Sequence, residues 1–144
     1  MIKKVSGFTL VELLVVIGII GILMGVSLFG LQGAREASRD ARRKSDLELI
    51  RGGLEIYKSD CDHYPSSLST SLVGGPPPVS CSASNTYISS VPKDPLDPAR
   101  NYPYSGLTTT YTLCASLENP PSPAVDTTGC GNCGVTCNYK VTNP

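Results

Sequence analysis

Between Phe8 and Leu31 the sequence runs for 24 residues with a single charge, Glu12. As an α-helix this run would be about 36 Å long, which is enough to cross a hydrocarbon core of about 30 Å. Lys3 and Lys4 precede the run, and basic residues at that place favour an N-terminus held in the cytoplasm. A chain of this kind cannot fold as one ordinary globule, because its apolar end needs a lipid or protein environment.

A secretory signal peptide and a plain single-pass anchor are the simplest interpretations of this run. The run is too long for a typical signal peptide, and no small-residue cleavage site follows it, since charged Arg35 and Glu36 separate Ala34 from Ala37. A plain anchor has no use for Glu12, because a carboxylate inside a membrane segment costs roughly 2.5–3.5 kcal/mol on insertion scales. The composition of the run alone does not exclude the anchor.

The residues around Glu12 resemble a known processing signal. Gly7-Phe8-Thr9-Leu10-Val11-Glu12-Leu13 is similar to the prepilin cleavage and methylation motif. The resemblance implies that a membrane peptidase cuts after Gly7 and that the new N-terminal residue, Phe8, is N-methylated. Glu12 then matches the conserved glutamate at the fifth position of mature pilins. The implied partners are the prepilin peptidase/N-methyltransferase, the inner membrane with its assembly platform, and identical or homologous pilin subunits.

Elementary electrostatics agrees with this interpretation. Cleavage would remove both leader lysines and leave a positive amine on Phe8 at the start of an apolar helix. Glu12 of one subunit would neutralise that amine on its neighbour, so each buried charge would find its partner only by assembly. We therefore expect Glu12 to set assembly and axial register.

An amphipathic stalk follows the apolar run. Apolar or small residues recur at helical spacing, with one missed step at Lys44, and predict the face that packs on the rest of the chain: Ala34, Ala37, Ala41, Leu47, Ile50, Leu54 and Tyr57. One helix of about 78 Å from Phe8 to Ser59 is expected. Gly52-Gly53 indicates either close packing of a sheet or a hinge.

The basic triplet Arg42-Arg43-Lys44 lies on this stalk. It is compatible with a nucleic-acid patch, but a solvated helix face that pairs with acidic neighbours in a filament is favoured. The formal net charge of the chain is +0, so no global field points to nucleic acid. No nucleic-acid partner is expected.

The C-terminal half is rich in Pro, Gly, Ser and Thr and holds six cysteines: Cys61, Cys81, Cys114, Cys130, Cys133 and Cys137. Their even number after an apolar segment predicts disulfides formed outside the cytoplasm, with 15 possible pairings. Strands are expected at 87–91, 102–104, 108–117 and 135–141, with an irregular loop over 119–134. The predicted fold class is α+β and pilin-like, with a long N-terminal helix packed against a small antiparallel sheet.

A second resemblance covers most of residues 1–117. DARRKSDLELIRGGLEIYKSD, Tyr64-Pro65 and VPKDPLDPARNYPYSG are similar to the major pseudopilin of type II secretion systems. The resemblance implies a calcium ion that orders the last loops through acidic and carbonyl oxygens. The corresponding stretch here, LENPPSPAVDTTGCGNCG, is poor in carboxylates and rich in cysteine. We therefore expect no metal or other cofactor, with disulfides ordering these loops instead.

The spacing Cys130-x-x-Cys133-x-x-x-Cys137 leaves three interpretations open. A structural disulfide cluster is favoured by the extracytoplasmic position. A zinc site completed by His63 or another cysteine, and a thiol-redox site, are the alternatives. With one histidine, no phosphate-binding glycine pattern and no carboxylate pair, the chain is not expected to be an enzyme.

These observations divide the chain into a leader (1–7), a transmembrane and filament-core helix (8–31), a helical stalk (32–60) and a disulfide-rich β module (61–144). The expected function is that of a structural subunit of a type IV pilus-like or type II secretion filament. The subunit would first be a single-pass inner-membrane protein with its C-terminal module outside the cytoplasm, then part of an extracytoplasmic filament. The alternative is a minor pilin that acts as a DNA- or surface-binding module.

Overall fold

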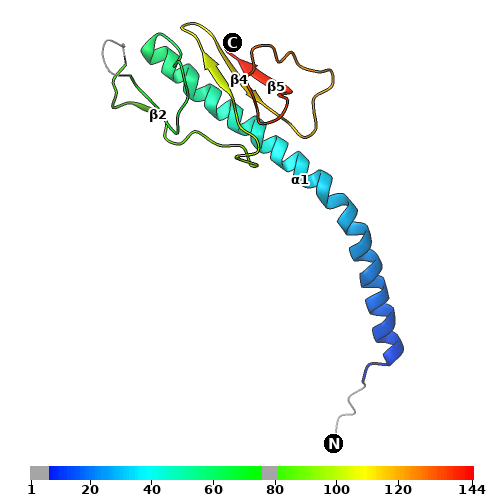
Figure 1. Ribbon diagram of the computed structural model, residues 1–144. Helices are drawn as coiled ribbons and strands as arrows, with labels where there is room; N and C mark the ends of the chain where they lie inside the picture. Colours follow the sequence, from blue (N-terminus) through cyan, green and yellow to red (C-terminus); the bar gives the residue numbers. More distant parts are fainter. Residues whose placement is uncertain (1–6, 76–80) are drawn as a thin grey trace, which may run out of the picture. The chain divides into compact units, whose positions relative to one another are not determined.

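One long helix, α1 (Leu10–Cys61), dominates the computed structural model, which describes residues 7–75 and 81–144 apart from the side chains of residues 28 and 29 (Figure 1). The helix begins and ends within two residues of the limits that the sequence predicts. The chain divides into two compact units, the first ending at Glu36 and the second spanning Ala37–Pro144. The second unit, called the module below, contains every strand.

The apolar part of α1 is exposed within the single chain. Its most apolar stretch has a mean hydropathy of 2.7, and none of that stretch is buried within the chain. By length and composition the helix is able to cross a membrane. Its large side chains are mostly half or more exposed, as Leu10 at 78% and Ile22 at 70% show. Because such a surface is unfavourable in water, this segment needs lipid or other apolar helices around it.

The module holds two small antiparallel sheets. In the first, β1 (Leu72–Val73) pairs with β2 (Thr86–Ile88). In the second, β4 (Tyr111–Ala115) lies between β3 (Tyr104–Gly106) and β5 (Tyr139–Thr142). The α+β class and the antiparallel pairing are confirmed. The structure has a strand within or overlapping each predicted range, whereas the two-residue β1 was not predicted because it is too short to form a pattern.

The core lies between α1 and both sheets. Seven positions of α1 spaced by three or four residues are buried and form what we call the core stripe: Asp40, Arg43, Leu47, Ile50, Leu54, Tyr57 and Cys61. Its apolar part packs with Ile88 of β2 and Leu113 of β4. The prediction that Ala34, Ala37 and Ala41 continue this face is wrong, since all three are exposed. The buried face is continued instead by Asp40 and Arg43. Arg43 is tolerated there because the loops of the module place the carboxylates of Asp94 and Glu118 beside it.

Of the two adjacent glycines on the stalk, Gly52 and Gly53, only Gly53 lies where a strand packs closely against α1. A Cβ atom on Gly53 would lie 2.3 Å from Cγ1 of Ile88, so β2 approaches α1 as closely as the missing side chain allows. A Cβ atom on Gly52 would meet no atom within 4 Å. The packing interpretation is thus confirmed for Gly53, and α1 is continuous through both residues.

Candidate functional site

The residues at the head of α1 form a capping box. The carboxylate of Glu12 accepts hydrogen bonds from the backbone N–H and the hydroxyl of Thr9, both at 2.8 Å. In return, the Glu12 N–H donates to Oγ1 of Thr9 at 3.3 Å. Reciprocal bonds of this kind between an N-cap threonine and a glutamate three residues later fix the start of a helix. The helix therefore begins at Leu10 and leaves Gly7 and Phe8 in a non-helical, exposed segment.

This geometry gives Glu12 a partner within its own chain. The helix-capping role of Glu12 was not predicted above, although the Thr-x-x-Glu spacing is a known signal for it. These bonds come from uncharged groups, so the expectation that Glu12 meets an opposite charge only by assembly stays a prediction. Its carboxylate binds the amide of Thr9, which directly follows Phe8, so it lies beside the place where cleavage would create the new amine. Lys3 and Lys4 lie outside the described residues.

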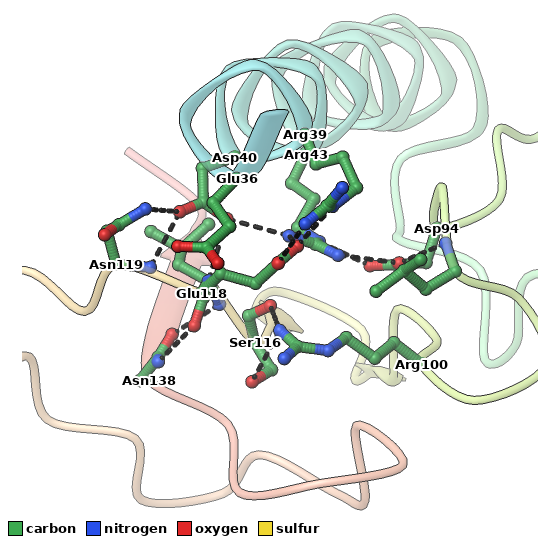
Figure 2. A network of polar contacts seen from close by, with 12 residues as sticks. Glu36, Arg39, Asp40, Arg43, Asp94, Arg100, Ser116, Glu118, Asn119 and Asn138 are labelled. Carbon is green, nitrogen blue, oxygen red and sulfur yellow. Dashed lines mark hydrogen bonds and ion pairs between the residues drawn. The ribbon is translucent and has the colours of Figure 1, made fainter. Parts of the chain in front are cut away.

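A second polar site joins α1 to the loops of the module, and we call it the charge cluster: Arg39, Asp40, Arg43, Asp94 and Glu118 (Figure 2). Arg43 is at its centre and has 0% exposure. Its guanidinium binds Asp94 through two nitrogens, at 2.8 and 3.1 Å. Nη1 of Arg43 also donates to Asp40 and to Glu118, each at 2.8 Å. A planar, always charged guanidinium suits such multidentate binding better than an ammonium group does.

The surrounding groups complete the hydrogen bonding of the cluster. Nε of Arg39 donates to Glu118 at 2.6 Å, and Asp40 accepts from the backbone N–H groups of Glu118 and Asn119, each at 2.8 Å. Among the described residues, every buried side-chain nitrogen or oxygen has a hydrogen-bond partner. Since a buried charge is tolerated only when it is paired and hydrogen-bonded, the cluster fixes where the loop after β4 and the loop around Asp94 meet α1.

The six cysteines form three disulfides: Cys61–Cys81, Cys114–Cys130 and Cys133–Cys137. The first ties the end of α1 to the segment before β2. The second joins β4 to the loop that follows it, and the third closes a short turn before β5. Near that turn, the backbone N–H of Asn101 donates to the carbonyl of Cys133 at 3.2 Å. The loops are thus held by covalent bonds as well as by the charge cluster.

This pairing overturns the other two interpretations of the cysteine spacing. A redox site needs Cys130 to pair with Cys133, but each pairs elsewhere. A zinc site needs free thiolates, and the described residues contain no free cysteine. Nδ1 of His63 lies 2.7 Å from the carbonyl oxygen of Cys61, as suits a polar residue at the helix end. No group of three or more possible metal ligands occurs in the part of the chain that the structure describes.

Comparison with known protein families shows to which family this chain belongs. A family described as "Prokaryotic N-terminal methylation motif" matches residues 2–28. A family described as "Type II secretion system (T2SS), protein G" matches residues 31–119, which is more than half of the chain. This chain belongs to the type II secretion protein G family. The prepilin and pseudopilin resemblances of the sequence are thereby confirmed, and the family is one of structural pseudopilin subunits.

Individual members of the protein G family agree with this assignment. "Type II secretion system core protein G" of Escherichia coli (strain K12) is 37% identical over 97 residues, which cover 64% of this chain and 67% of that protein. The proteins of the same description from Aeromonas hydrophila and Klebsiella pneumoniae are each 34% identical, over 65% of this chain and 68% and 70% of theirs. No solved structure matches the chain significantly.

The calcium ion that the pseudopilin resemblance implies does not fit the residues of this protein G family member. The stretch 117–134 has two carboxylates, Glu118 and Asp126. Glu118 is bound by two arginines of the charge cluster. Asp126 accepts from the N–H of Thr128 at 2.8 Å and lies 3.2 Å from Nζ of Lys140. Because cations of the protein already neutralise both carboxylates, neither offers a divalent ion the free negative charge it requires.

The basic triplet is divided among three environments in this family member. Arg43 is buried in the charge cluster, so neither the nucleic-acid interpretation nor the solvated-face interpretation holds for it. Arg42 is exposed and lies 3.9 Å from Asp46 on the next helical turn. Nζ of Lys44 lies 5.9 Å from the ring centroid of Tyr139. The triplet therefore does not present one continuous basic patch.

The charge cluster makes the stability of the protein G module depend on pH. Hydrogen bonds from Arg39, and then from Arg43, lower the pKa of Glu118 from 4.5 to about 2 despite its burial. A lowered pKa in the folded state stabilises the fold above the unfolded pKa, and this contribution is lost as pH falls toward the folded value. We expect the free energy of unfolding to drop by about 2 kcal/mol between pH 5 and pH 2 through this group.

Urea unfolding of the full-length protein in detergent, followed by the near-ultraviolet dichroism of its tyrosines, would measure this dependence. All seven tyrosines lie in the module, so the signal reports on it alone. The matched variant is Glu118→Gln, which removes the titrating group and keeps its shape. Its stability should vary less with pH in this window, and parallel curves for the two proteins would contradict the assignment.

Proposed function

We propose that this protein is a filament subunit of a type II secretion pseudopilus, processed after Gly7 and assembled through its N-terminal helix. One observation carries the proposal: an exposed apolar helix with a defined start is joined to a module braced by disulfides and a buried charge cluster. Such a chain can exchange lipid for the helices of its neighbours while the module keeps its fold. Before assembly, the helix would hold the subunit in the inner membrane with the module outside the cytoplasm.

In this proposal the capping box prepares Glu12 for its second role. Its carboxylate is already turned toward the amide that follows Phe8. Once a peptidase has cut the exposed Gly7–Phe8 bond, the carboxylate would bind the methylated amine of a neighbouring subunit. An ion pair buried among apolar helices is strongly destabilised when one partner is removed, by about 3–5 kcal/mol. The partners implied are further copies or homologues, the prepilin peptidase/N-methyltransferase and the assembly platform.

Two substitutions separate the two roles of Glu12. Glu12→Gln keeps a side chain that can form the capping box but removes the charge, whereas Thr9→Val removes the cap and keeps the charge. We expect Glu12→Gln to reduce filament formation at least about tenfold, the effect of losing some 1.4 kcal/mol or more. Thr9→Val should assemble nearly as well as the wild type, because a lost cap costs only about 1 kcal/mol.

The readout is the amount of sheared filament from producing cells, with the mass of the mature N-terminal peptide as the processing control. All three proteins should yield a peptide that begins at methylated Phe8. Normal filaments from Glu12→Gln would show that the carboxylate acts only as a helix cap. An intact leader in assembled wild-type material would contradict processing itself and reduce the chain to a single-pass anchor.

A further inference from the structure

The C-terminal end of α1 borders a cavity that neither the capping box nor the charge cluster uses. It lies between the last turns of the helix, the turn that follows them and the loop that joins β3 to β4, and its volume is about 460 Å³. Pockets that hold small ligands commonly measure about 300–1,000 Å³. We call this cavity the hydroxyl pocket, because its lining combines aromatic rings with aliphatic hydroxyl groups: Tyr57, His63, Tyr64, Ser66, Ser67 and Thr108.

Hydrogen bonds between the two walls fix the shape of the hydroxyl pocket. The backbone N–H of Tyr64 donates to the carbonyl of Thr108 at 3.2 Å, which ties the turn after α1 to the loop between β3 and β4. The hydroxyl of Tyr104 donates to the carbonyl of Pro65 at 2.7 Å and joins the same two segments a second time. The pocket is therefore formed before any ligand arrives, which lowers the cost of binding.

Several hydrogen-bonding groups of the hydroxyl pocket are available to a ligand. Ser66, Ser67 and Thr108 are exposed, and within the described part of the chain their hydroxyls have no hydrogen-bond partner. Nδ1 of His63 lies 2.7 Å from the carbonyl oxygen of Cys61. Because a carbonyl only accepts, Nδ1 carries the proton of the neutral ring, and Nε2 is left as an acceptor. The pocket thus offers both donors and acceptors.

The segments that build the hydroxyl pocket are free of charge. Residues 64–92 contain no charged side chain and eleven serines or threonines, and residues 101–117 also contain no charged side chain, although 17% of the whole chain is charged. Among the described residues no carboxylate, lysine or arginine lines the pocket, and His63 is the one basic group there. The pocket therefore has no fixed charge to neutralise a phosphate, a carboxylate, an amine or a metal ion.

This combination of groups suits an uncharged, polyhydroxylated ring. Sugar hydroxyls donate to and accept from serine and threonine hydroxyls, which do the same in return. The C–H face of a pyranose ring packs favourably on aromatic rings, whose faces are electron-rich. The ring of Tyr57 is held edge-to-face by that of His63, with centroids 5.7 Å apart, so the aromatic wall is fixed in place. Tyrosine and serine are also the residues that antibodies use to recognise varied polar surfaces.

We propose that the hydroxyl pocket binds an uncharged oligosaccharide. Its pyranose rings would contact the parts of Tyr57 and Tyr64 that line the pocket, and its hydroxyls would bond to Ser66, Ser67 and Thr108. The proposal goes beyond the filament function and does not depend on it, because the site lies entirely within the module of one chain. If the module lies outside the cytoplasm, it shares a compartment with the polysaccharides of the cell envelope.

Backbone amide chemical shifts of the full-length protein, in a detergent without a sugar headgroup, would test the site. The probes are triacetylchitotriose and maltotriose, two uncharged trisaccharides that differ in their N-acetyl groups. We expect saturable shift changes at residues 63–67 and 106–108 by about 10 mM of at least one probe. A stronger response to triacetylchitotriose would identify an N-acetylated glycan as the source of the ligand, and a stronger response to maltotriose would identify a glucan.

Variants at the mouth of the hydroxyl pocket separate binding there from binding elsewhere. Ser67→Glu places a charge in the mouth and should weaken binding at least about tenfold. Ser89→Glu is the matched control, because it makes the same change at an exposed position of the same uncharged segment, away from the pocket, and should bind as the wild type does. Thr108→Val should weaken binding about fivefold, the effect of one lost neutral hydrogen bond. All three positions are exposed, so the tyrosine dichroism should not change.

Three results would overturn the proposal. The first is the absence of a saturable shift with either trisaccharide, and the second is a set of shifts that lies outside the pocket or is the same in Ser67→Glu and the wild type. The third is tighter binding of trigalacturonate, an anionic trisaccharide, than of both neutral probes. Because these measurements use the single protein, they succeed or fail independently of whether the wild type is processed and forms filaments.

Discussion

Replacing Arg43 with methionine is expected to lower the free energy of unfolding of the module by about 3–5 kcal/mol. Methionine fills much of the same volume but leaves Asp94, Asp40 and Glu118 without their shared cation. Asp94 suffers most, since its side chain has 0% exposure and binds two nitrogens of Arg43. The loss arises from uncompensated buried carboxylates rather than from a cavity.

Urea unfolding of full-length protein in detergent, followed by tyrosine dichroism, would measure the change. Arg42→Met is the matched control, because it removes the same charge one residue away from a side chain that is 66% exposed. An exposed pair contributes about 0–1 kcal/mol, so the control should remain near wild type. Equal stability of the two variants would contradict the central role of Arg43.

The second large effect is expected from the disulfide between β4 and the following loop. Replacing Cys114 and Cys130 together by alanine should cost about 3 kcal/mol, because that bond closes a loop of 16 residues. The pair Cys133 and Cys137 closes a loop of only 4 residues, so its removal should cost about 2 kcal/mol by the same chain-entropy argument. The difference follows from loop length, since longer loops lose more unfolded-state entropy when closed.

Chelation and reduction of the wild-type protein test whether a metal ion or the disulfides order the last loops. Thermal unfolding of the wild type should be unchanged by excess chelator and should shift downward on reduction. If chelator lowers the transition temperature and calcium restores it, a divalent ion contributes to the fold. Such a result would contradict our conclusion that Glu118 and Asp126 are already neutralised within the protein.

Sequence patterns predicted the fold where the pattern is long or strongly repeated. The helix was predictable because apolar and amphipathic periods cover about fifty residues, and β4 because Thr, Tyr and Leu are concentrated in 108–117. The short motif from Gly7 to Glu12 indicated the prepilin class from the sequence alone. Short strands such as β1 escape prediction, because a pair of residues has no period.

The same patterns failed where polar groups are buried. Alanine at 34, 37 and 41 appeared to continue the apolar face, yet Asp40 and Arg43 point inward. The partners that make this possible, Asp94 and Glu118, lie 51 and 75 residues from Arg43 along the chain. Local periodicity contains no information about such distant carboxylates. The disulfide pairing was unpredictable for a similar reason, since spacing alone permits every combination.

The strands of the module have a consequence for the proposed filament, in which many subunits would be held close together. An exposed strand edge can template pairing with another chain and lead to aggregation. Here the outer strands β3 and β5 have three and four residues, and Lys140 lies within β5. The longer β4 has neighbours on both sides. Edges this short offer little for a second sheet to extend, so subunits crowded in the proposed filament would have little tendency to form amyloid-like stacks.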